Sequence, residues 1–169
     1  MSESGQARPI QGVALAVDVA CFQVRDGRLT LLLARRANPP FAGSWALPGG
    51  LVGTNEPLDR AAHRVLDERT GVHSFYLEQL YTFGGPARDP RGRTVSVTYY
   101  TLLGAGDPAE HPGRGISELT WCAADDPPDL AFDHAAIAAY ARRRLAQKIS
   151  YAPLAFRVLA EHFTMADLR

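Results

Sequence analysis

Charged side chains that could act on a phosphate ester are concentrated between Gly50 and Val72. The segment has the pattern G-x5-E-x7-R-V-L-x-E-R-x-G-V, in which Glu56, Arg64 and Glu68 are charged positions. Carboxylate oxygens bind hard cations such as Mg²⁺, which are often shared with substrate phosphates. A metal ion held in this way polarises a phosphoryl oxygen and helps to activate water. The segment therefore has residue types suited to metal-assisted chemistry on a diphosphate.

The same segment has the periodicity of an amphipathic helix. Pro57 suits a first helical turn, and Gly71 suits a C-terminal stop. Between them, apolar side chains recur at i, i+3, i+4, i+7 and i+8, namely Leu58, Ala61, Ala62, Val65 and Leu66. Positions 65, 68 and 69 then share one patch, where only Glu68 is acidic. Asp67 lies about 100° around the helix from its neighbour, off this patch.

With Trp45-Ala-Leu-Pro-Gly49 before it, the segment resembles the Nudix box, G-x5-E-x7-R-E-U-x-E-E-x-G-U, where U is aliphatic. The matching positions are Gly50, Glu56, Arg64, Leu66, Glu68, Gly71 and Val72. Val65 and Arg69 stand where the family has glutamates that commonly bind the metal ion. The resemblance implies that Glu56 and Arg64 mainly hold the loop and helix together. We therefore expect impaired hydrolysis, with Glu68 as the one remaining metal ligand of the patch.

Two interpretations of Arg69 stay open. A cation near a helix C-terminus is favoured by the helix dipole, so Arg69 could be a solvated surface residue, with Val65 continuing the apolar stripe. Alternatively, the Arg69 guanidinium takes the place of the metal ion and binds a diphosphate through bidentate hydrogen bonds.

Composition indicates one soluble domain. The chain has 169 residues, of which 46% are hydrophobic and 21% charged, and its net charge is zero, which gives no global electrostatic case for nucleic-acid binding. No segment has the pattern of a membrane span or a signal peptide. Cys21 and Cys122 lie in apolar runs and are expected to be buried thiols, as is typical of a cytoplasmic protein.

Alternation and turn residues predict the remaining elements. Strands are expected over residues 13–24, 29–34, 45–47, 75–83, 94–103 and 119–123, with a hairpin turn at Asp26-Gly27 and a late helix over residues 132–149. Strands on both sides of the motif helix predict an α/β fold, an α/β/α sandwich with a mixed sheet. This is the fold that the Nudix resemblance implies. The domain is expected over residues 11–149, after a flexible tail of residues 1–10.

A second resemblance covers the chain from about Val13 to its end. It rests on the ordered segments Arg88–Tyr100, Leu130–His134, Tyr151–Phe156 and Glu161–Leu168. These are similar to the NrtR group, Nudix-related transcriptional regulators of NAD metabolism. The resemblance implies a homodimer whose Nudix-like domain senses ADP-ribose or a similar nucleotide sugar. Residues 150–169 then read as a linker and a truncated start of a winged helix, so that DNA binding is not expected of this chain alone.

The ligand-binding candidates surround the box. They are Arg35, Arg36, Trp45, Gly49, Gly50, Arg69, Arg88, Arg91 and Arg93. The Trp45 indole could stack on an adenine or pack in the core beside Pro48. In the Asp133-His134 pair, the aspartate is expected to cap the late helix, and the histidine to be a surface residue or a general base.

Three functional interpretations remain. The first is a ligand sensor that binds ADP-ribose or a related nucleoside diphosphate derivative, requires no cofactor and hydrolyses its ligand poorly. The second is an active Mg²⁺-dependent Nudix hydrolase in which Glu56, Arg64 and Glu68 are the catalytic candidates. The third is the regulatory half of a repressor, in which the ligand sensor of the first interpretation would act.

Overall fold

One mixed sheet organises the computed structural model, which describes residues 12–73, 76–104 and 110–151. Its strands are β1 (Ala14–Arg25), β2 (Arg28–Arg36), β3 (Trp45–Ala46), β4 (Gly49–Leu51), β5 (Glu78–Phe83), β6 (Thr94–Leu103) and β7 (Ile116–Ala123). The helices are α1 (Leu58–Thr70) and α2 (His134–Tyr151). The predicted tail and the predicted start of a winged helix lie outside the described residues. Neither described helix combines the length and apolar character needed to cross a membrane.

Strand β1 is the centre of the sheet. It pairs in parallel with β6 along residues 14–23, and the other pairings between the named strands are antiparallel, so the sheet is mixed as expected. An isolated parallel bridge also joins Trp45 to Leu130. On its other side β1 pairs first with β4, through residues 16–18, and then with β2, through residues 22–25. Asp18 and Gly49 form the last pair between β1 and β4 before β1 changes its partner to β2.

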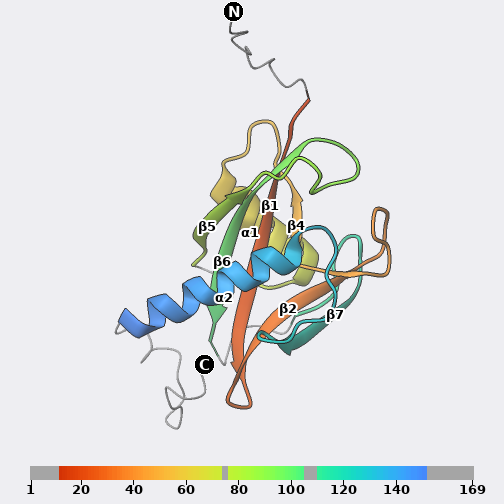
Figure 1. Ribbon diagram of the computed structural model, residues 1–169. Helices are drawn as coiled ribbons and strands as arrows, with labels where there is room; N and C mark the ends of the chain where they lie inside the picture. The colour runs from red at the N-terminus through yellow and green to blue at the C-terminus, as the bar shows by residue number, and fades with distance from the viewer. Residues whose placement is uncertain (1–11, 74–75, 105–109, 152–169) are drawn as a thin grey trace, which may run out of the picture.

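The helices cover opposite faces of this sheet, because successive residues of a strand point to opposite sides. Val17 and Val19 of β1 pack in one core with Val65 and Leu66 of α1. Phe22, on the other face, packs with the apolar side chains of α2. Figure 1 shows α2 across one face of the sheet and α1 behind it. The predicted α/β/α sandwich is confirmed.

Most predicted elements are present, although several bounds differ: β7 begins at Ile116 instead of residue 119, and α2 begins at His134 instead of residue 132. The hairpin turn at Asp26-Gly27 is confirmed, with φ of 49° and 75° at its two residues. Pro57 is the residue before α1 rather than part of its first turn, whereas Gly71 ends the helix in the left-handed conformation. Strand β4 was not predicted, because its Gly-Gly sequence lacks the alternation of a strand. Cys122 is only half-buried, unlike Cys21.

Candidate functional site

A cavity of about 280 Å³ opens beside the partner change of β1. Its walls come from β1, β2 and β4, from the C-terminal end of α1, and from the loops that carry residues 88–94, 115–116 and 132. Six of the predicted ligand residues line it: Arg36, Gly49, Gly50, Arg69, Arg88 and Arg91. The fold therefore brings together residues that are more than 50 positions apart in the sequence.

Two glycines of β4 allow the floor of the cavity to form. A Cβ atom on Gly49 would lie 2.0 Å from Asp18 Oδ1, and one on Gly50 would lie 2.9 Å from Val65 Cγ2. Both distances are shorter than real Cβ contacts, so a side chain at either position would displace its neighbour. The Gly-Gly pair thus brings the backbone of β4 against the Asp18 carboxylate and against α1.

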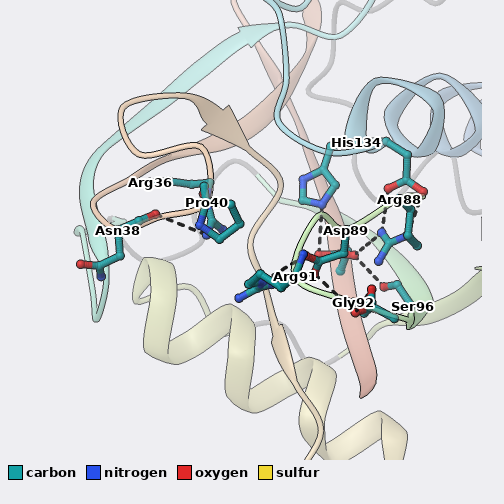
Figure 2. A network of polar contacts seen from close by, with 12 residues as sticks. Arg36, Asn38, Pro40, Arg88, Asp89, Arg91, Gly92, Ser96 and His134 are labelled. Carbon is teal, nitrogen blue, oxygen red and sulfur yellow. Dashed lines mark hydrogen bonds and ion pairs between the residues drawn. The ribbon is translucent and has the colours of Figure 1, made fainter. Parts of the chain in front are cut away.

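Asp18 lines the cavity and is the centre of a polar network. Figure 2 shows three members of this network, Arg88, Ser96 and His134. Ser96 Oγ donates to Asp18 Oδ2 at 2.6 Å, and His134 Nε2 lies 3.4 Å from Asp18 Oδ1. His134 Nδ1 accepts the Leu47 N–H at 3.0 Å. Burial lowers the pKa of His134, so the ring is neutral and its proton is on Nε2, towards Asp18. The prediction of a surface histidine was wrong, because the ring is 4% exposed.

Two of the arginines at the cavity are already paired with carboxylates. Arg88 binds Asp133 in a bidentate pair, with distances of 2.9 and 2.7 Å, and its Nη2 lies 3.4 Å from Asp18 Oδ2. Asp133 stands at the predicted cap position before α2, where its carbonyl accepts the Ile137 N–H at 3.2 Å, but both of its carboxylate oxygens accept from Arg88. Arg91 binds Asp89 at 3.0 and 2.7 Å, and these hydrogen bonds lower the pKa of Asp89 to about 2. The positive charges of Arg88 and Arg91 are therefore partly neutralised by these aspartates and are less available to a ligand.

Arg36 and Arg69 differ from Arg88 and Arg91 in the groups that they bind. Arg36 Nε donates to the Pro40 carbonyl at 2.7 Å, and its guanidinium lies 4.9 Å from the centre of the Phe132 ring. Arg69 Nη1 donates to the Arg114 carbonyl. Within the described part of the chain, no carboxylate forms an ion pair with either guanidinium. Burial lowers the pKa of both, and for Arg36 the charges of Arg91 and Arg69 lower it further. These two cations favour an anionic ligand.

The residues of the box do not fit a magnesium site of several carboxylates. Val65 is 1% exposed in the core, and Arg69 extends beside Gly50. Glu56 accepts from Arg64 at 2.6 Å and from the Gly53 N–H at 2.9 Å, which lowers its pKa to about 2. The remaining glutamate, Glu68, accepts from Arg64 at 3.2 Å. Among the residues that the structure describes, no three His, Cys, Asp or Glu side chains are grouped to hold a metal ion.

Three predicted ligand residues do not line the cavity. Arg35 binds Glu118 at 3.1 Å, and its guanidinium lies 5.7 Å from the centre of the Trp45 ring. Trp45 packs against the hydrophobic core that includes the apolar side chains of α2. This agrees with the prediction that the indole packs in the core and not with the alternative that it stacks on an adenine. Arg93 donates to the Gly84 carbonyl at 2.5 Å.

Sequence reasoning also missed several residues of the cavity, namely Asp18, Asp89, Phe132 and Gly115. Asp18 had a signal, because it is a carboxylate inside an otherwise apolar strand. No sequence signal marked Phe132 as a residue of the cavity, although its φ is 57° and its ring lies beside the guanidinium groups of Arg36 and Arg91.

Comparisons with known proteins show the family of this chain. The NUDIX domain family matches residues 14–145. The ADPR responsive transcriptional repressor NtrR of Acinetobacter baylyi is 36% identical over 159 residues, which cover 92% of this chain and 63% of NtrR. An ADP-ribose pyrophosphatase of Methanocaldococcus jannaschii is 36% identical over 62% of this chain and 60% of that protein. The chain thus spans less than two thirds of either relative.

A solved structure is similar as well. The NUDIX domain of Shewanella oneidensis NrtR, cocrystallised with ADP ribose, has a TM-score of 0.74 and is 35% identical, over 86% of this chain and 99% of that domain. The family match covers most of the chain, and both helices and the mixed sheet lie almost entirely within it. This chain belongs to the NUDIX domain family.

Proposed function

We propose that this domain binds ADP-ribose or a related nucleoside diphosphate derivative in the cavity and hydrolyses it poorly. The observation that carries the proposal is the cavity itself, in which Arg69 extends beside Gly50 and Val65 replaces a possible carboxylate ligand. Anion binding is retained through Arg36 and Arg69, whereas the ligand set for a metal ion is reduced. The relatives support this choice of ligand, because one responds to ADPR and another was crystallised with ADP ribose.

The biological setting that we propose is sensing in a regulator of NAD metabolism. It is supported by the similarity to NtrR, a transcriptional repressor. A homodimer and a cytoplasmic location belong to this proposal.

A thermal-shift titration tests the binding. A ligand that binds only the folded state stabilises it by RT ln(1 + [L]/Kd), so ADP-ribose should raise the melting temperature progressively, and ribose 5-phosphate should do so less. The same samples, incubated with Mg²⁺ and assayed for AMP, should show little release. Absence of any shift with ADP-ribose removes the sensor proposal.

A second function, Mg²⁺-dependent hydrolysis, has one specific observation in its favour. The frame of Gly50, Glu56, Arg64 and Glu68 is intact, and Arg64 joins both glutamates to the β4 carbonyl of Leu51. The similarity to an ADP-ribose pyrophosphatase agrees with it. Rapid release of AMP in the assay above would favour this function over sensing.

A further inference from the structure

The end of helix α1 that carries Arg69 is held by the segment of residues 111–116. The last carbonyls of a helix lack partners within it. Here the carbonyls of Glu68, Arg69 and Thr70 accept backbone N–H groups at 3.0, 3.0 and 2.8 Å. The donors are Arg114, Gly113 and His111, in that order. These three backbone hydrogen bonds hold the segment of α1 from which the Arg69 side chain extends.

Glycines in this segment make the approach possible. A Cβ atom on Gly113 would lie 1.9 Å from the Glu68 carbonyl oxygen. At Gly115, which has a φ of 74°, a Cβ atom would lie 2.8 Å from Arg69 Nη1. A side chain at residue 115 would therefore collide with the Arg69 guanidinium, and Gly115 leaves the space that this group occupies. Arg69 thus forms part of the cavity wall, and its side chain is partly exposed.

Arg36 lies on another wall of the same cavity, and it is tied to the same segment. The next residue, Ala37, donates its N–H to the Gly115 carbonyl at 3.0 Å. The Phe132 ring, 4.9 Å from the guanidinium, and the Pro40 carbonyl hold the Arg36 side chain. The end of strand β2 and the C-terminal end of helix α1 thus present two guanidinium groups to one cavity.

Both groups keep unused donors. A guanidinium has five N–H donors. Within the described residues, the hydrogen bonds of Arg36 go to two carbonyls, and Arg69 makes one. Since neither group is paired with a carboxylate there, the remaining donors can bind an anion without first breaking an ion pair. Arg88 and Arg91 lack this property, because each already binds an aspartate.

We propose that Arg69 and Arg36 bind the diphosphate bridge of the ligand directly, with the Arg69 guanidinium in place of a metal ion. This rests on the proposed function for the identity of the ligand. Guanidinium groups match phosphate oxygens in bidentate geometry. A diphosphate substituted at both ends carries one negative charge on each phosphate at neutral pH, which two arginines balance. Nucleoside triphosphates carry more charge and normally arrive with Mg²⁺, so they fit this pair less well.

Titration calorimetry with ADP-ribose, and separately with inorganic pyrophosphate, tests the proposal. The affinity of the unaltered protein for ADP-ribose should be the same in chelator as in Mg²⁺. A hydrogen bond to a charged group contributes about 1.5–3 kcal/mol, so Arg69→Ala and Arg36→Ala should each weaken binding roughly ten- to hundred-fold. Arg69→Lys keeps the charge but loses the planar fork, and should be intermediate.

Two glycine variants provide a matched comparison. Gly115→Ala and Gly27→Ala impose similar backbone strain, because φ is 74° and 75°, but a Cβ atom at Gly27 meets nothing within 4 Å. Only Gly115→Ala should weaken binding, since it displaces the Arg69 guanidinium. Equal affinity in the two variants overturns the proposal. If Gly115→Ala fails to fold, the Arg69→Lys variant and the comparison of chelator with Mg²⁺ decide.

The outcomes separate this inference from the proposed function. Binding of ADP-ribose that requires Mg²⁺, or that is unchanged in Arg69→Ala, overturns the inference and leaves the proposed function standing. Binding of pyrophosphate alone, in chelator and dependent on Arg69, supports the inference while the proposed ligand fails. If neither compound binds, both are wrong.

Discussion

Removal of the Arg88 guanidinium should be among the most destabilising single changes around the cavity. The Arg88 side chain is 5% exposed and is paired with Asp133 and with Asp18, whose side chains are 24% and 8% exposed. Arg88→Met keeps most of the aliphatic volume but leaves two carboxylates without their cation. Breaking a buried ion pair in this way costs about 3–5 kcal/mol. That is a large part of the roughly 5–15 kcal/mol by which domains are stable.

Urea denaturation at neutral pH measures this loss of stability. Arg35→Met is the matched control, because Arg35 and Glu118 are 47% and 53% exposed and such pairs contribute about 1 kcal/mol or less. Equal losses of stability in the two variants would refute the described network.

Three further changes test other parts of the site. The free energy of unfolding should fall from about pH 7 to pH 5, because His134 takes up a proton more readily in the unfolded state than in the folded state, where burial lowers its pKa. His134→Gln should flatten this pH dependence, as measured by denaturation curves. Gly49→Ala should cost about 1–3 kcal/mol by overpacking, and Gly84→Ala, with its nearest contact at 3.7 Å, much less in the same assay. Val65→Glu combined with Arg69→Glu should create or raise AMP release from ADP-ribose with Mg²⁺; no gain counts against the proposal that Val65 and Arg69 impair hydrolysis.

The elements of the fold could be predicted because their signals are local. The stripe of α1 and the Asp26-Gly27 turn each lie within a few consecutive residues, and both were confirmed. Strand β4 could not be predicted in this way. Its pairing with β1 depends on the close approach of Gly49 to Asp18, residues 31 positions apart, and glycines carry no strand signal.

The candidate site was predictable only in part, since it depends on contacts between distant loops. The spacing of the box placed Arg69 near a phosphate site, but its orientation depends on Gly113 and Gly115 in a later loop. Arg35 and Arg36 were indistinguishable by residue type, yet only Arg36 reaches the cavity. His134 was misjudged because the partner of its Nδ1, the Leu47 N–H, is 87 residues away.

The central claim is that this cavity binds a nucleoside diphosphate sugar and leaves its diphosphate bond intact. A ³¹P NMR time course of ADP-ribose with stoichiometric protein and Mg²⁺ tests it most directly, because binding and cleavage alter the same spectrum. We predict shifted or broadened diphosphate resonances that persist for hours. Rapid growth of the phosphomonoester resonances of AMP and ribose 5-phosphate, or a spectrum that the protein does not change, would contradict the claim.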